Sequence, residues 1–381
     1  MDGAATLAFL DGCGTTSPCG LSPARRPPYP AAVVQRLPMV LAEALSRYPR
    51  TRLTEGPTPL QRLRRVEAAL GSALNGVQLY GKRDDLMGLG GGGSKLRKLE
   101  MLLGDAAAKG ADVIVATGGR QSNSLRLTAA ACAREGLACE LVLAPAAPDA
   151  DGDFRENGNA LLDPLFGATV HQVPAGMGAA EFARTRIDAL SAQGRTPYLT
   201  PAGASSSLSA LGYARCALEL DAQLAELGLD EPVIVTANGS FGTQAGLLAG
   251  FRILDRPQRI HGFTILAAAD DCRQGTQAMA NDALALLDSP TRLGPDEVQI
   301  FEEQRGEGYG RVTAEALAAI RLMASHEGLL LDPVYSGKAF AGVLDHARTG
   351  RYRPGAAVVF LMTGGSPALF AYRQALAPQP V

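Results

Sequence analysis

Short apolar runs alternate with helical patterns along most of the chain. The two clearest runs are DVIVAT and PVIVTA, and each precedes a glycine-containing loop and then a helical pattern, at 125–134 and from Thr243. Apolar runs of this length predict buried strands. The predicted strands are 77–80, 112–117, 140–143, 232–237, 260–267 and 357–362. Because buried strands alternate with helices, we expect an α/β fold with a parallel sheet covered on both faces.

The N-terminal stretch differs from the rest in being rich in Gly, Pro, Ala and Arg up to about residue 37. Such a composition buries little apolar surface, so we expect residues 1–45 to form a poorly ordered extension. A short helix is expected at 39–47, since Pro38 stands where the start of a helix tolerates proline.

Composition narrows the classes of function. Of the 381 residues, 46% are hydrophobic and 19% charged, which is ordinary for a soluble globular protein. A net charge of −2 gives no reason to expect nucleic acid or an anionic membrane as a partner. No apolar run approaches the roughly 20 residues that span a bilayer. A secretory signal requires basic residues before its apolar region, and none precedes the apolar patch at 4–10. We therefore expect a cytoplasmic enzyme.

Cysteine and histidine patterns exclude several kinds of site. The six cysteines form no CxxC pair, and the four histidines lack the spacing of zinc ligands. No GxSxG sequence is present, which argues against an α/β-hydrolase. We expect free thiols and no metal site, so the reactive groups must lie elsewhere.

The glycine run at 90–93 precedes a candidate reactive lysine, Lys95. A P-loop would need Gly, Lys and then Ser or Thr, whereas Ser94 comes before the lysine; no strand leads into the run as a dinucleotide fingerprint requires. The remaining interpretation is a tight turn that delivers Lys95 into a cleft at a helix start. Helix dipole and desolvation both lower the pKa there and favour the neutral amine that forms a Schiff base. On this segment alone, a solvated surface lysine is the alternative.

Two further loops follow predicted strands, where ligands of α/β folds bind. The first, GGRQSNS at 118–124, places small polar side chains at a helix start. They can bind a ring hydroxyl or a carboxylate, or simply cap the helix. The second, ANGSFGT at 237–243, suits an anion, because glycines let backbone N–H groups approach it. The absence of lysine there favours a monophosphate; a plain tight turn is the alternative.

Three more segments carry candidate tyrosines or glycines: GYG at 308–310, DPVYSGK at 332–338, and TGGSP at 363–367 after a predicted strand. Tyrosine hydroxyls in such loops can contact substrate or transfer protons. Singly, they are more often structural.

Together these segments resemble the pyridoxal-phosphate (PLP) enzymes grouped as D-cysteine desulfhydrase and 1-aminocyclopropane-1-carboxylate deaminase. The similarity runs from GPTPLQRL at Gly56 to TGGSPALFAY, which ends at Tyr372. It implies a fold-type II PLP enzyme, like the tryptophan synthase β subunit, with two domains that each hold a mostly parallel sheet flanked by helices. A large domain (46–97 plus 206–381), a small domain (98–205) and a homodimer are expected.

The resemblance also implies roles for individual residues. Lys95 would carry the cofactor and then move protons, Ser122 would lie near the substrate, and Asn123 would contact the ring hydroxyl. The phosphate loop would be Gly239, Ser240, Phe241, Gly242 and Thr243. Tyr309 and Tyr335 would be active-site tyrosines, and Thr363 would lie near the pyridine nitrogen.

Several positions depart from the family pattern. The cyclopropane deaminases carry Glu where Ser336 stands, which favours β-elimination over ring opening. The family usually has Asn at Ser94 and His or Gln at Ser124, and Arg120 replaces an apolar residue. Arg120 beside the substrate serine would select a second anionic group, unless it is a salt-bridged arginine at the rim. The expected substrate contacts are Arg120, Gln121, Ser122 and Ser124.

The expected activity is a PLP-dependent lyase or deaminase that performs α,β-elimination on D-cysteine or a related β-substituted amino acid, giving a keto acid and ammonia. A cyclopropane-carboxylate deaminase and an enzyme with a specialised biosynthetic substrate are the alternatives. A PLP-binding protein without turnover is a third possibility, of a different class. The combination of Lys95, Ser122, Tyr309 and Tyr335 argues against the last.

Overall fold

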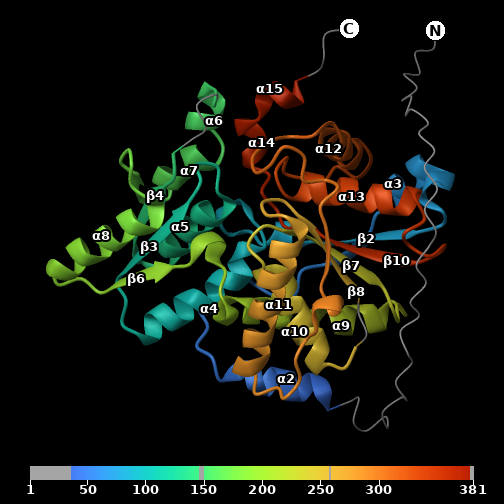
Figure 1. Ribbon diagram of the computed structural model, residues 1–381, viewed down its shortest axis with the longest axis horizontal. Coiled ribbons are helices and arrows are strands. Elements are labelled where there is room, and N and C mark those ends of the chain that lie inside the picture. Colours follow the sequence, from blue (N-terminus) through green and yellow to red (C-terminus); the bar gives the residue numbers. More distant parts are fainter. Residues whose placement is uncertain (1–35, 146–149, 257–258, 378–381) are drawn as a thin grey trace.

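The computed structural model describes residues 36–145, 150–256 and 259–377, which form an α/β fold with two sheets (Figure 1). The larger sheet has the strand order β1-β2-β10-β7-β8-β9, and only its β1–β2 pair is antiparallel. Its strands are β1 (Leu60–Arg62), β2 (Gln78–Lys82), β7 (Val233–Asn238), β8 (Arg259–Thr264), β9 (Gln299–Phe301) and β10 (Ala357–Leu361). The smaller sheet is parallel, in the order β5-β4-β3-β6. Its strands are β3 (Val113–Gly118), β4 (Ala138–Leu143), β5 (Thr169–Gln172) and β6 (Pro197–Thr200).

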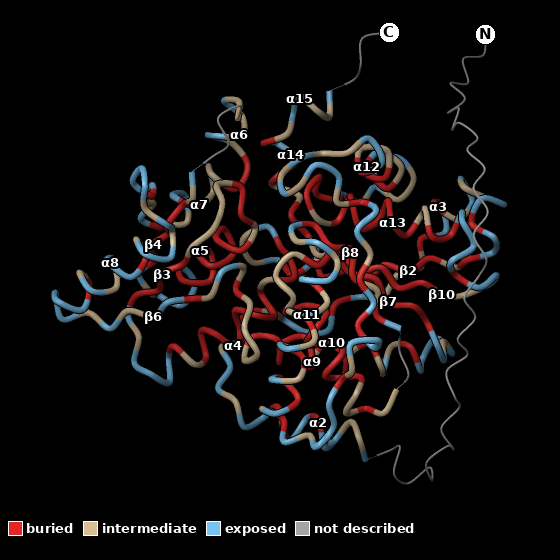
Figure 2. The backbone as a smooth tube through the Cα atoms, viewed as in Figure 1, coloured by how far each residue is buried: buried red, intermediate tan, exposed pale blue. Residues whose placement is uncertain are grey.

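Helices cover both faces of the larger sheet because successive residues of its buried strands point to opposite sides. In β7, Ile234 joins the apolar cluster on one face, while Val233 and Val235 join the cluster on the other. The helices of the first face are α2 (Leu37–Ser46), α9 (Ser207–Glu226), α10 (Gly242–Ile253) and α11 (Ala269–Leu286). Those of the second face are α3 (Arg64–Leu70), α12 (Ala314–Glu327) and α13 (Ser336–Arg348). Figure 2 shows the resulting buried layer between them.

The smaller sheet follows the same rule. Ile114 and Ala116 of β3 pack with α4 (Lys95–Ala108) and α5 (Asn123–Glu135), whereas Val113 and Val115 face α8 (Ala179–Ala192). The remaining short helices are α6 (Gly152–Glu156), α7 (Asn159–Leu165), α14 (Ala368–Ala371) and α15 (Arg373–Leu376). The α/β fold expected from the sequence is confirmed.

The helix predicted at 39–47 is α2, which begins two residues earlier, with Pro38 in its first turn. Its Leu41 and Leu45 are buried against the larger sheet's helices, so this part of the predicted extension is a packed element, not a poorly ordered one. The apolar spacing of Leu41 and Leu45 explains the difference, because it gives the helix a face to bury. Residues 1–35 of the predicted extension lie outside the described residues.

The chain meets itself closely beside the start of α4. Gly93 and Gly364 form an isolated antiparallel bridge, and Ser94 N donates to Thr363 O at 3.0 Å. A Cβ added to Gly364 would lie 2.7 Å from Gly93 Cα, and both glycines have positive φ. The loop after β10 is thereby fixed to the residues that precede Lys95.

Within the described ranges, no helix is both long and apolar enough to cross a bilayer.

Candidate active site

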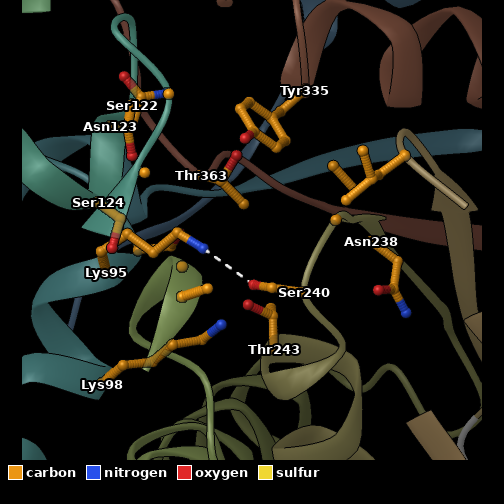
Figure 3. A pocket seen from close by; sticks show the side chains of 18 of the residues that line it. Lys95, Lys98, Ser122, Asn123, Ser124, Asn238, Ser240, Thr243, Tyr335 and Thr363 are labelled. Carbon is orange, nitrogen blue, oxygen red and sulfur yellow. Dashed lines mark hydrogen bonds between the residues drawn. The ribbon is translucent and has the colours of Figure 1, made fainter. Parts of the chain in front are cut away.

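A cavity of about 250 Å³ lies where the loops after β3, β7 and β10 converge with the start of α4 (Figure 3). These loops come from both sheets, so the site is built between them. Most of the predicted site residues line it: Lys95, Ser122, Asn123, Ser124, Gly239, Ser240, Phe241, Thr243, Tyr309, Tyr335 and Thr363. Gly242 begins α10 but is not among the lining residues.

Lys95 is the first residue of α4 and extends into the cavity toward Ser240 (Figure 3). Its Nζ lies 3.5 Å from Ser240 Oγ. Burial lowers the pKa of Lys95 to about 8, against a partial opposing effect of its contact with Lys98. The lowered pKa raises the fraction of neutral amine near neutral pH, and attack on a carbonyl carbon requires this form.

Lys98 is a site residue that sequence reasoning missed. It lies one turn after Lys95 on α4, lines the same cavity and donates to Ser205 Oγ at 2.8 Å. Burial lowers its pKa well below the usual value, and the nearby charge of Lys95 lowers it further. The signal was present in the sequence KLRK, since residues three apart share a helix face.

The turn between β7 and α10 is tightly organised around Asn238, the last residue of the strand. Asn238 Oδ1 accepts a hydrogen bond from Phe241 N, which fixes a turn where Phe241 has the unusual φ of 65°. A Cβ on Gly239 would lie 2.9 Å from Tyr335 Cε1, so only glycine fits there. The turn thus brings backbone N–H groups and the α10 N-terminus to the cavity.

The groups around this turn suit a phosphate. Ser240 Oγ lies 2.8 Å from Ser205 Oγ, and Thr243 lines the cavity beside them. Lys98 adds a buried amino group at the same end of the cavity, and a bound phosphate would favour its protonated form (Figure 3). Hydroxyls, a helix N-terminus and a lysine form a donor set for a monophosphate. With Lys95 alongside, the residues present fit pyridoxal phosphate.

The loop before α5 serves both roles that its sequence allowed. Ser122 caps the helix by accepting from Leu125 N at 3.3 Å, and it also lines the cavity together with Asn123 and Ser124. The first N–H groups of α5 therefore face the same space as these side chains.

Two residues of this loop are not where the sequence predicted. Gln121 is buried away from the cavity, and its Nε2 donates to the carbonyls of Phe154 and Asn157, both at 2.8 Å. Arg120 donates to the carbonyl of Arg155 and does not line the cavity either. The tight turn between β3 and α5 directs these two side chains to the α6 segment, so neither of the two expected substrate contacts lines the cavity.

Tyr309 and Tyr335 meet in the wall of the cavity, where the hydroxyl of Tyr335 donates to that of Tyr309 at 3.0 Å. Burial raises the pKa of Tyr335 well above its usual value, and partial desolvation raises that of Tyr309, which is 41% exposed. Both therefore keep their protons at neutral pH. Ser336, the next residue, turns away: its hydroxyl donates to Asp332 Oδ1 at 2.7 Å and is buried in the DPVYS turn.

Comparison with known proteins places this geometry in a family. A family model described as pyridoxal-phosphate dependent enzyme matches residues 51–364. The chain belongs to this family. The resemblance stated from the sequence and the expected cofactor are confirmed, and the chain is a PLP-dependent enzyme.

The chain matches nearly the whole length of the relatives compared with it. D-cysteine desulfhydrase of Serratia proteamaculans is 39% identical over 338 residues, which is 88% of this chain and 99% of that protein. D-cysteine desulfhydrase of Yersinia pestis is 40% identical over 342 residues, again 88% and 99%. A solved structure of an "ACC deaminase homologue" has a TM-score of 0.78 and 35% identity, covering 88% of this chain and 98% of that one. O-ureido-L-serine synthase, with a TM-score of 0.60 at 21% identity, shares the fold.

Proposed function

We propose that this PLP enzyme catalyses α,β-elimination on D-cysteine or a related β-substituted amino acid. With D-cysteine and water the products are pyruvate, ammonia and hydrogen sulfide. The observation that carries the proposal is the arrangement of Lys95 between a phosphate-binding turn and the Tyr309–Tyr335 pair in one cavity. The high coverage of relatives named D-cysteine desulfhydrase supports the same reaction.

Each group in the cavity has a task in such an elimination. Ser122, Ser124 and the α5 N-terminus bind the substrate carboxylate through neutral donors. Pyridoxal phosphate supplies an electron sink that stabilises negative charge at the α-carbon. Lys95 is placed to remove the α-proton as a base, because burial favours its neutral amine. Tyr309 donates a proton to the leaving sulfur.

The charges in the cavity favour a substrate whose side chain is neutral. Among the described residues that line it, Lys95 and Lys98 are the only basic side chains, and no carboxylate is present. Both lysines are assigned to the cofactor, so a second anionic group on the substrate would have no partner. The selection by Arg120 expected from the sequence is therefore not part of this proposal.

The visible absorption spectrum of the purified holoenzyme tests the proposal. We expect a band from the lysine-bound cofactor that changes on addition of D-cysteine, with release of pyruvate and sulfide. Lys95→Ala removes both the band and the turnover, whereas Lys109→Ala, which breaks a surface pair with Asp105, leaves them unchanged.

Other outcomes of this experiment would indicate a different function. A band that ignores D-cysteine but changes with 1-aminocyclopropane-1-carboxylate would make the chain a deaminase of the ring-opening type. A band with no turnover of either compound would leave a specialised amino acid or a binding protein. Absence of a band after addition of PLP would overturn the placement of the cofactor.

We also propose that the enzyme is a cytoplasmic homodimer, with the large and small domains divided at residues 97 and 205. Light scattering should then give about twice the chain mass of 39.6 kDa, and a monomeric holoenzyme would contradict it.

A further inference from the structure

Arg126 is a buried cation directly behind the cavity wall. Its side chain on α5 is fully buried and does not line the cavity. The guanidinium donates to Asn159 Oδ1 at 2.7 Å and to Asn123 Oδ1 at 3.1 Å. It also donates to Gly92 O at 2.8 Å, in the glycine run that leads to Lys95. Arg126 therefore reaches the cavity only through these neighbours.

The donors of Arg126 fix the orientation of two side-chain amides. A guanidinium can donate but not accept, so the atom of Asn159 that faces it must be the amide oxygen. Asn159 Nδ2 is consequently turned the other way, and it donates to Gln121 O and to Asn123 Oδ1, both at 2.9 Å. Asn159 is completely buried, so water does not compete for these bonds.

The orientation of Asn123 follows from the same bonds. Its Oδ1 accepts from both Arg126 and Asn159, while the residue itself lines the cavity. In the described part of the chain, no hydrogen bond to a protein acceptor is formed by Asn123 Nδ2. The wall of the cavity thus presents a donor, not an acceptor, at this position.

The charge of Arg126 persists near neutral pH. Burial lowers its pKa to about 10, partly offset by the carboxylates of Asp163 and Asp332. A cation at the end of a chain of hydrogen bonds polarises each amide in turn and strengthens the last donor. Asn123 Nδ2 is therefore a stronger donor than an isolated amide.

We propose that Arg126, acting directly on Asn123 Oδ1 and through Asn159, is a positioning residue that makes Asn123 Nδ2 the group presented to the hydroxyl oxygen on the cofactor ring. The inference rests on the proposed placement of the cofactor with Asn123 beside its ring hydroxyl. A donor on that oxygen stabilises its negative charge, most of all when the nitrogen linked to Lys95 has lost its proton. The donor therefore lowers the pH at which the visible band of the bound cofactor changes.

Asn159→Asp tests the orientation with minimal change of shape. The new carboxylate can still accept from Arg126, but it offers Asn123 an acceptor where Nδ2 was a donor. The carboxylate repels Asn123 Oδ1 and attracts Nδ2, and only the longer bond from Arg126 to Oδ1 opposes it, so the amide turns over and presents its oxygen to the cavity. Arg126→Met is the second variant, which frees both amides. Arg186→Met, which breaks an ion pair with Glu140 on the smaller sheet, is the matched control.

The measurement is the absorption of each holoenzyme as a function of pH, without substrate. We expect the midpoint pH of the absorption change to rise by about one to two pH units in Asn159→Asp. Loss of a hydrogen bond to a charged group implies a shift of this size. Arg126→Met should shift it in the same direction and Arg186→Met should not. In an Asn123→Ala background, Asn159→Asp should add no further shift.

Equal midpoints in the wild type and both variants, including bands that do not respond to pH at all, would overturn the inference. So would a shift of Asn159→Asp that is just as large without the Asn123 amide. Because no turnover is measured, a holoenzyme that fails to act on D-cysteine would sink the proposed reaction and leave this result standing.

Discussion

The hydroxyl of Tyr335 donates a hydrogen bond to the hydroxyl of Tyr309, with 3.0 Å between the two oxygens. Tyr309 accepts that bond and keeps its own proton for another acceptor. Both phenols lie in the cavity wall, and burial raises both pKa values. The pair is therefore directional: Tyr309 is the donor available to the substrate, and Tyr335 orients it.

Replacing each tyrosine in turn should separate these roles. Tyr309→Phe removes the donor and should lower kcat for D-cysteine by about 10²–10⁴-fold, the usual contribution of a positioned acid. Tyr335→Phe leaves the Tyr309 proton in place, so its loss should be smaller. Steady-state rates of pyruvate release measure both. Equal losses, or a greater loss for Tyr335→Phe, would refute the assignment.

Lys338 should control the loop that carries Tyr309. It is fully buried on α13, and its Nζ donates to Arg305 O at 2.7 Å and to Gly308 O at 3.1 Å. Lys338→Met leaves the carbonyls of the half-buried Arg305 and Gly308 without their donor, which costs roughly 1–3 kcal/mol of folding free energy. We also expect a lower kcat and faster proteolysis at 305–310. Thermal unfolding and limited proteolysis measure these effects.

The control for Lys338 is Arg351→Met, which breaks an exposed ion pair with Glu303. Such pairs contribute about 0–1 kcal/mol. If the two variants lose the same stability and the loop stays resistant to protease, Lys338 does not hold it.

The buried carboxylate of Asp84 should be essential to the folded state. It accepts from Arg97 at 2.8 Å and 3.0 Å and from Tyr213 at 2.7 Å, and it is fully buried. Asp84→Ala leaves Arg97 with less compensation and should cost about 3–5 kcal/mol in denaturant unfolding. Asp153→Ala, which removes the partner of the exposed Arg373, should cost under about 1 kcal/mol. Similar losses in both variants would be inconsistent with this account.

Two buried histidines should make the fold sensitive to acid. Burial lowers the pKa of His261 to about 3 and that of His346 to about 4, from the usual 6.5. As the pH falls below about 6.5, these histidines become protonated in the unfolded chain but stay neutral in the folded chain. Their contribution is thus complete above that pH and is lost below it, by up to about 1.4 kcal/mol per pH unit for each group.

Urea unfolding at several pH values between 7.5 and 4.5 measures this loss. His346→Phe removes one of the two groups, so the wild type should lose more stability than the variant as the pH falls through this range. The difference in stability between the two proteins should therefore change with pH. A difference that is independent of pH would contradict the assignment.

The sequence predicted the cavity where its walls follow strands buried on both faces. The runs that became β3 and β7 are long and apolar, so their ends, and with them Asn123 and Ser240, could be located. β6 is short, partly exposed and begins with Pro197, and it was not predicted. The turn after it therefore escaped notice, although Gly203 lines the cavity.

The direction of a side chain within a loop could not be predicted in the same way. Ser122 directly follows Arg120 and Gln121 in the sequence, yet the hydrogen-bond partners of these two residues lie on the α6 segment. No local pattern announces that contact, because it depends on where a distant segment packs. Asn159 was missed for the same reason, since its four bonds unite residues that are 33 to 38 positions apart.

The bridge between Gly93 and Gly364 sets an order of events during synthesis of the chain. Ser94 bonds to Thr363, so the wall that holds Lys95 is complete only after residue 363 has been synthesised and has joined the fold. A nascent chain that stalls earlier already carries the lysine but lacks the corner that encloses it. Binding of the cofactor therefore depends on two segments that lie far apart in the sequence.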